Sequence, residues 1–158
     1  MVNNIVVAIG GTTHSLVTAK YAVCLAKLLR ASLTGVCVVN TKALEELLKS
    51  KVFVEVEVRE FEQDLEAAGR RFLDKIKKLA EDKRVDFKGK VCKGVVAEQV
   101  MRQIEDLEAG LLVMGQPTKQ LPDGKIFCEE AEDIFRESKC PVVVVRDAQA
   151  VENLYKEL

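Results

Sequence analysis

The sequence contains no tryptophan, and aromatic residues make up only 5% of the chain. Proteins that bind single-stranded nucleic acid stack bases on aromatic side chains, so this composition offers little for such a surface. The 24 basic and 25 acidic residues leave a formal net charge of −1, which argues against nucleic acid and anionic membrane surfaces as partners. No apolar run approaches the ~18 residues that cross a bilayer, so no membrane insertion is expected.

Histidine is scarce and cysteine has no pairing pattern. His14 is the single histidine and no CxxC or HExxH pattern occurs, so neither a zinc site nor another cofactor is predicted. The five cysteines are odd in number and lie in apolar sequence, which argues against a disulfide framework. Residues 1–11 lack a basic region and a cleavage site, so no signal peptide is predicted. We therefore expect a cytoplasmic protein.

Apolar periodicity predicts strands and helices that alternate along one domain. Continuous apolar runs predict buried strands, and an alternating run with lysines predicts an edge strand; the five segments are 5–9, 33–39, 85–92, 111–114 and 142–145. Helical spacing predicts helices within 15–29, 61–79, 95–107 and 131–135. This order predicts an α/β fold, a doubly wound parallel five-stranded sheet with helices on both faces. Residues 1–147 form the domain and 148–158 a C-terminal tail.

Residues 40–59 allow two structures. Leu44, Leu47 and Leu48 predict a short helix. After it, four valines between 52 and 58 alternate with other residues, which is the period of a strand. We favour an extra exposed strand here; the alternative is that these β-branched residues begin the next helix.

The fold class predicts where a ligand would bind. In doubly wound sheets, ligands bind outside the carboxyl ends of the strands, where the strand order reverses. This rule points to Gly10–Thr13, to Val39–Thr41 and to the residues from Gly115 onward.

Five segments in this order resemble the universal stress protein family from about Asn4 to Arg146. They are Ile-Val-Val-Ala-Ile-Gly-Gly-Thr at 5–12, the helix at 15–26, the strand from Leu33-Thr34 to Val38-Val39, Leu-Val-Met-Gly at 112–115 and Cys-Pro-Val-Val-Val-Val-Arg at 140–146. The resemblance implies a parallel sheet of strand order 3-2-1-4-5 and a homodimer.

The resemblance also shows where this chain departs from members that bind ATP. Those members carry an aspartate directly after the first strand, where this chain has Gly10. They also carry a Gly-x2-Gly-x9-Gly-Ser/Thr motif after the fourth strand. Counted from Gly115, the later motif positions fall on Thr118, Cys128 and Glu129, so one motif glycine remains.

These substitutions oppose phosphate binding. Glycines let backbone N–H groups approach phosphate oxygens, whereas Thr118 and Cys128 add side chains there. Carboxylates from Glu129 onward suit a helix N-terminus but repel a polyphosphate. The resemblance thus implies a degenerate ligand pocket, whose residues are Gly10, Gly11, Thr12, Val39, Gly115, Thr118, Cys128 and Glu129.

Other reactive residues allow a functional and a structural interpretation. His14 could contact a ligand or cap a helix, and Lys119 and Lys125 could attract an anion or be solvated loop residues. Cys128 lies at a helix start, where thiolates are favoured, although acidic neighbours oppose this. Cys140 precedes a proline and suits the core. These residues supply no set of nucleophile, base and orienting group, so we do not expect an enzyme.

Three functions remain open at this stage. The first is a stress-associated regulatory or interaction protein that does not bind ATP, with a protein partner left unidentified; the second is a small-ligand module that uses the altered pocket. The third, a nucleotide hydrolase, is opposed by the motif changes. In the implied strand order, Val142, Val143, Val144 and Val145 lie at a sheet edge, which is an aggregation hazard unless it is paired. We therefore expect a homodimer through this last strand.

Overall fold

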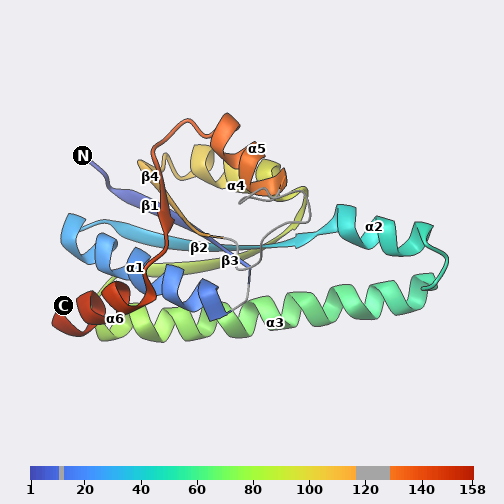
Figure 1. Ribbon diagram of the computed structural model, residues 1–158, viewed down its shortest axis with the longest axis horizontal. Coiled ribbons are helices and arrows are strands. Elements are labelled where there is room, and N and C mark those ends of the chain that lie inside the picture. Colours follow the sequence, from blue (N-terminus) through green and yellow to red (C-terminus); the bar gives the residue numbers. More distant parts are fainter. Residues whose placement is uncertain (11–12, 117–128) are drawn as a thin grey trace.

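Figure 1 shows the computed structural model, which describes residues 1–10, 13–116 and 129–158. The strands are β1 (Asn4–Ile9), β2 (Ser32–Asn40), β3 (Phe87–Gly94), β4 (Leu111–Gly115) and β5 (Val142–Val145). The helices are α1 (Thr13–Leu29), α2 (Thr41–Lys49), α3 (Glu55–Asp82), α4 (Val96–Asp106), α5 (Glu129–Glu137) and α6 (Ala148–Glu157). Within the described ranges, no helix is long and apolar enough to cross a membrane.

The strands form one parallel sheet in the order β3-β2-β1-β4-β5, which confirms the predicted topology. The central strand β1 pairs with β2 on one side and with β4 on the other. Val6 and Val7 point to opposite faces of the sheet, and both are completely buried. The continuous apolar run in the sequence therefore reflects a strand that is covered on both faces.

Helices cover the two faces of the sheet in separate layers (Figure 1). On one face α1, α3 and α6 pack around a core that includes Val23, Ile76 and Val151. On the other face α4 and α5 pack around a core that includes Val100 and Ile134. The predicted doubly wound sandwich is confirmed by this arrangement.

The extra strand predicted at residues 52–59 is wrong, and the alternative interpretation is the one observed. Helix α3 begins at Glu55 and continues for 28 residues. Val58 is buried against Val39 and Leu44, whereas the other three valines of the run are exposed. The alternation in the sequence therefore does not mark a buried face, and packing of one valine overrides the local β-propensity of the run.

The predicted short helix is α2, and with the first half of α3 it forms a helical hairpin that projects beyond the sheet (Figure 1). We call residues 41–66 the arm. The Asn40 side chain accepts a hydrogen bond from the backbone N–H of Ala43 at 3.3 Å, which starts α2 directly at the end of β2. A small core holds the base of the arm in place; its buried residues are Val39, Leu44 and Val58.

The predicted C-terminal tail forms α6, which packs along α1. Val151 of α6 is buried, and Lys20 of α1 pairs with Glu152 of α6 at 2.7 Å. The Tyr155 hydroxyl donates a hydrogen bond to the backbone carbonyl of Leu79 at 2.9 Å. These contacts tie α6 to both α1 and α3.

Candidate functional site

Three strand ends meet at the centre of the carboxyl edge of the sheet, where the strand order reverses. Gly10 directly follows β1, Asn40 ends β2, and Gly115 ends β4. Because β1 pairs with both of the other strands, these ends are neighbours. The fold thus brings together the described ends of the three predicted segments, at the place where doubly wound sheets bind ligands.

The turn after β1 forms its own hydrogen bond. The backbone N–H of Gly10 donates to Ser15 Oγ at 3.0 Å. Among the described residues, the nearest atom to a Cβ built on Gly10 is the same Ser15 Oγ, 3.9 Å away. The described residues therefore do not obstruct a Cβ at this position.

The end of β2 offers little side-chain surface to a ligand. Val39 is 3% exposed, and its side chain packs against Leu44 and Val58 at the base of the arm. Asn40 uses its side-chain oxygen to begin α2. The predicted pocket residue on this strand, Val39, thus belongs to the small core at the base of the arm.

The β4 end leads into the segment that carries the motif changes. The backbone N–H of Gln116 donates to the Val145 carbonyl at 3.3 Å, which holds the end of β4 against β5. Several predicted residues lie outside the described part of the chain; they are Gly11, Thr12, Thr118, Lys119, Lys125 and Cys128. The backbone of α1 includes His14, whose side chain is also outside that part.

Helix α5 begins at Glu129, whose side chain lies outside the described part of the chain, and four of the first five residues in its sequence are acidic. Carboxylates in the first turn interact favourably with the partial positive charge of a helix N-terminus. The same charges oppose a phosphate at that terminus. Asp133 also forms an ion pair with Arg136 within the helix. Among the described residues, no group of three His, Cys, Asp or Glu side chains is placed to hold a metal ion.

Four cysteines are described, and all are free thiols: Cys24, Cys37, Cys92 and Cys140. Burial raises the pKa of the Cys24 and Cys37 thiols, which keeps both protonated and weakly nucleophilic. Cys37 lies against Gly69 of α3, whereas Cys92 packs on the side of α4. Although β2 and β3 are neighbours, these two thiols therefore lie on opposite faces of the sheet.

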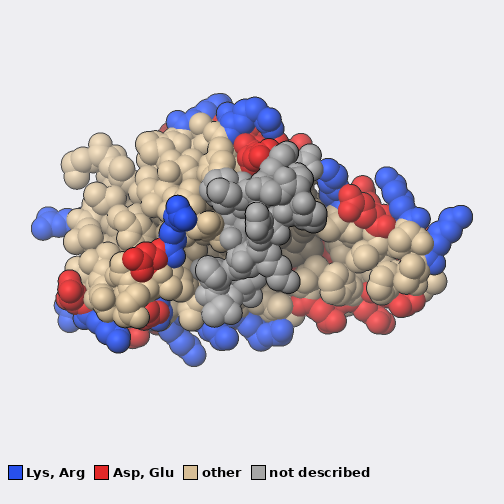
Figure 2. Space-filling model, viewed as in Figure 1, with Lys and Arg blue, Asp and Glu red and all other residues tan. Residues whose placement is uncertain are grey.

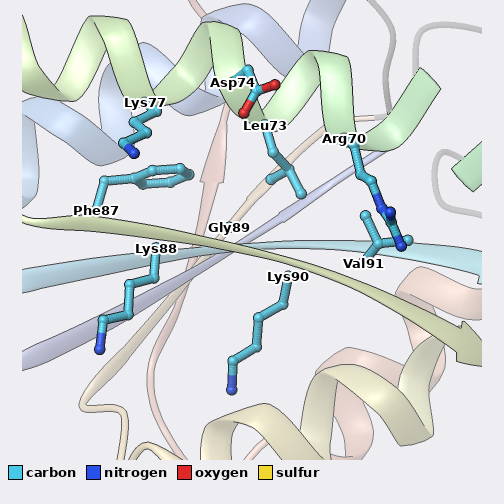
Figure 3. A pocket seen from close by; sticks show the side chains of 9 residues that line it. All are labelled: Arg70, Leu73, Asp74, Lys77, Phe87, Lys88, Gly89, Lys90 and Val91. Carbon is cyan, nitrogen blue, oxygen red and sulfur yellow. The ribbon is translucent and has the colours of Figure 1, made fainter. Parts of the chain in front are cut away.

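A groove of about 680 Å³ follows the edge strand β3 rather than the strand ends. Figure 3 shows Phe87 and Val91 pointing toward α3, and Lys88 and Lys90 pointing to the other side of the strand. Lys90 donates to the Gln103 side chain at 3.0 Å. Lys88 and Lys90 therefore do not form one anion-binding site with Arg70 and Lys77 of α3. We interpret the two β3 lysines as charges that protect a free sheet edge from pairing with another strand.

At the other edge, β5 pairs with β4 alone among the described strands. The N–H groups of Leu112 and Gln116 donate to the carbonyls of Pro141 and Val145 at 2.9 and 3.3 Å. Since backbone groups alternate sides along a strand, the intervening Val142 and Val144 direct theirs toward the open edge. Of the four valines predicted at an interface, Val145 is buried within the single chain.

The chain belongs to the universal stress protein family, whose model matches residues 1–146. It is 28% identical over 142 residues to universal stress protein MJ0531 from Methanocaldococcus jannaschii, a match that covers 90% of this chain and 81% of that protein. The solved structure of hypothetical protein MJ0577 has a TM-score of 0.75 at 18% identity, covering 93% of this chain and 97% of that one. A universal stress protein in complex with cAMP has a TM-score of 0.68 at 17% identity, covering 92% and 97%.

The exposed apolar surface of the arm is not predicted from the sequence. Its large exposed residues are Leu48, Val52, Phe53, Val54, Val56 and Phe61. The signal was the apolar run Val52-Phe53-Val54, which a turn between two helices cannot bury completely. The alternation of valines instead favours an exposed strand, so the sequence does not predict this surface.

Proposed function

We propose that this universal stress protein acts through association with other proteins, as a homodimer joined at β5, and does not bind ATP. The observation that carries the proposal is the acidic first turn of α5. In the ATP-binding members that the chain resembles, the corresponding position carries a small hydroxyl residue beside the phosphates. A carboxylate near a helix N-terminus typically stabilises the helix by roughly 0.3–1 kcal/mol, and its charge opposes a polyphosphate.

The β1 end supports the same proposal. Gly10 supplies no carboxylate, and its N–H group donates to the Ser15 hydroxyl oxygen. The predicted changes at Thr118 and Cys128 act at the glycine positions, where a Cβ obstructs the approach of backbone N–H groups to phosphate. ATP would thus lack the carboxylate after β1, meet side chains at the glycine positions and be repelled by the acidic residues of α5.

We propose that the protein has no catalytic role and acts in the cytoplasm. One histidine and scattered hydroxyl residues supply no set of nucleophile, base and orienting group. The free thiols of the buried Cys24 and the half-buried Cys37, together with the odd number of cysteines, suit a reducing compartment.

A second candidate is a small-ligand or nucleotide-binding module that uses the altered pocket. The structural likeness to a universal stress protein in complex with cAMP favours it. A cyclic monophosphate carries one negative charge, so the α5 carboxylates repel it less than they repel ATP.

Thermal shift measurements with ATP, cAMP and adenosine separate the two candidates. A ligand at about 100-fold its Kd stabilises the folded state by about 2.7 kcal/mol, which for a chain of this size raises Tm by roughly 5–11 °C. We expect ATP at millimolar concentration to raise Tm by less than about 2 °C. A shift with cAMP or adenosine alone would favour the second candidate, and micromolar ATP binding would refute the proposal.

A further inference from the structure

The arm carries most of the large apolar side chains that the described chain leaves exposed. Phe53 and Phe61 are 40% and 47% exposed, and both line a groove of about 380 Å³ between α2 and α3. Leu47 and Val58 complete its apolar wall. In a soluble protein a clustered apolar surface of this kind marks an interaction site.

The rim of this groove has one sign of charge. Glu57, Glu60 and Asp64 are its charged lining residues, and all three are exposed. None of the three has an ion-pair partner among the residues that the structure describes. By contrast, Glu62 and Glu66 of the same helix pair with Lys93 of β3. Figure 2 shows acidic side chains along the arm half of α3 and basic ones along its other half.

We infer that this groove binds a basic amphipathic helix of a partner protein, an inference that rests on the proposed function as an interaction protein. The apolar side chains of such a helix would enter between Phe53 and Phe61, as in other helix-in-groove complexes. Its lysines or arginines would face Glu57, Glu60 and Asp64. Charge complementarity of this kind favours the matching partner and suppresses others.

The same features disfavour other occupants. Two copies of the groove facing each other would bring their rim carboxylates together, and like charges across an interface are costly. An anionic lipid surface is repelled in the same way. An extended peptide needs free backbone groups to pair with, and the hydrogen bonds of α2 and α3 are made within each helix. A helix satisfies its own backbone and therefore fits.

The base of the arm supports binding because the groove is held in place before a partner arrives. Val39, Leu44 and Val58 fix α2 and α3 against the end of β2. A preformed apolar groove loses little conformational entropy when a partner binds, which favours association.

Fluorescence anisotropy with the full chain tests the inference. The probe is a labelled peptide of about 14 residues, or roughly four helical turns, with leucines on one face and lysines on the other. The reference probe has glutamates in place of the lysines. We expect the lysine peptide to bind and the glutamate peptide not to bind. The affinity for the lysine peptide should fall as the salt concentration rises.

Three variants locate the site. We expect Phe61→Ser to weaken binding by about tenfold or more, as an anchor residue does. The triple change Glu57→Gln, Glu60→Gln and Asp64→Asn keeps the apolar wall and should reduce both affinity and salt dependence. Leu28→Ser is the matched control, because Leu28 is 57% exposed on α1, outside the arm. Circular dichroism verifies that each variant is folded.

Several outcomes would overturn the inference. They are absence of binding to the unmodified chain, equal binding of both peptides, and equal effects of Phe61→Ser and Leu28→Ser. Co-sedimentation with phosphatidylglycerol vesicles would indicate that a lipid surface occupies the groove. Loss of self-association in Phe61→Ser would indicate that a second copy of this chain occupies it. ATP is titrated in a separate experiment. If the chain binds both ATP and the lysine peptide, the proposed function is refuted, whereas the inference that the groove binds a basic helix stands.

Discussion

At the scale of single residues, four positions separate this chain from the ATP-binding pattern it resembles: Gly10, Thr118, Cys128 and Glu129. Their effects have different physical origins, so they should act partly independently. We expect the quadruple variant with Gly10→Asp, Thr118→Gly, Cys128→Gly and Glu129→Ser to gain measurable ATP affinity in isothermal titration. Glu129→Ser alone should gain little, because side chains still obstruct the backbone. An ATP-binding Glu129→Ser single variant would contradict this account.

A second residue-scale prediction concerns the close approach of α3 to β3. A Cβ on Gly89 would lie 3.0 Å from the Leu73 Cβ, an atom that moves only with the α3 backbone. We expect Gly89→Ala to lower the free energy of unfolding by about 1–3 kcal/mol, measured by urea denaturation. The neighbouring Lys88 points away from α3 (Figure 3), so Lys88→Ala should stay within about 0.5 kcal/mol of the parent. Equal stability of the two variants would show that the α3 backbone shifts to accommodate the added Cβ at little energetic cost.

At the scale of elements, α6 is held by a titratable group. Burial, with a smaller effect from the Asp82 carboxylate, raises the pKa of Tyr155 above its ordinary value of 10.0. The protonated hydroxyl donates to the Leu79 carbonyl. The folded state therefore retains this proton more strongly than the unfolded chain, so its stabilising effect is complete below pH 10 and is lost as pH rises.

This direction of the pH dependence of stability gives a prediction for Tyr155→Phe. Near pH 8 the variant should be less stable than the parent by about 0.5–1.5 kcal/mol, the usual contribution of one hydrogen bond. Above about pH 10.5 the difference should shrink, since the parent then loses the bond and the variant has nothing to titrate. Urea denaturation at both values measures it. A difference that grows with pH would mean that the hydroxyl does not hold α6 as described.

At the scale of the whole molecule, the open β5 edge predicts the mode of dimerisation. Val144 directs its backbone N–H toward that edge, so Val144→Pro removes a donor needed for pairing and keeps the bonds to β4. We expect a dimer at micromolar concentration by analytical ultracentrifugation, and a folded monomer for Val144→Pro. Val144→Thr keeps the N–H and should remain dimeric. Substitution of Val145 would not test the interface, because this side chain is buried in the single chain.

Two results would contradict the β5 dimer. One is a monomer mass for the unmodified protein that does not change with concentration. The other is a dimer that survives Val144→Pro, which would shift the interface to another surface.

The sequence by itself determined the order of the elements, the buried strands and the family. The elements depend on local apolar periodicity: a run such as Ile5–Ile9 is interpretable because a strand covered on both faces tolerates no charge. The family follows from the resemblance of five segments in their order along the chain. The parallel topology follows from the alternation of such strands with helices. The glycine and carboxylate changes at the candidate site are likewise visible in the sequence.

Only the tertiary structure decided the arm and the surfaces that face partners. Whether the valines at 52–58 form a strand or begin a helix depends on burial of Val58 by Val39 and Leu44, and that contact is formed by residues distant in the chain. The contact of Tyr155 with Leu79 joins residues 76 positions apart, which no local pattern specifies. Non-local packing also decides which backbone groups of β5 face the open edge and which apolar residues of the arm stay exposed.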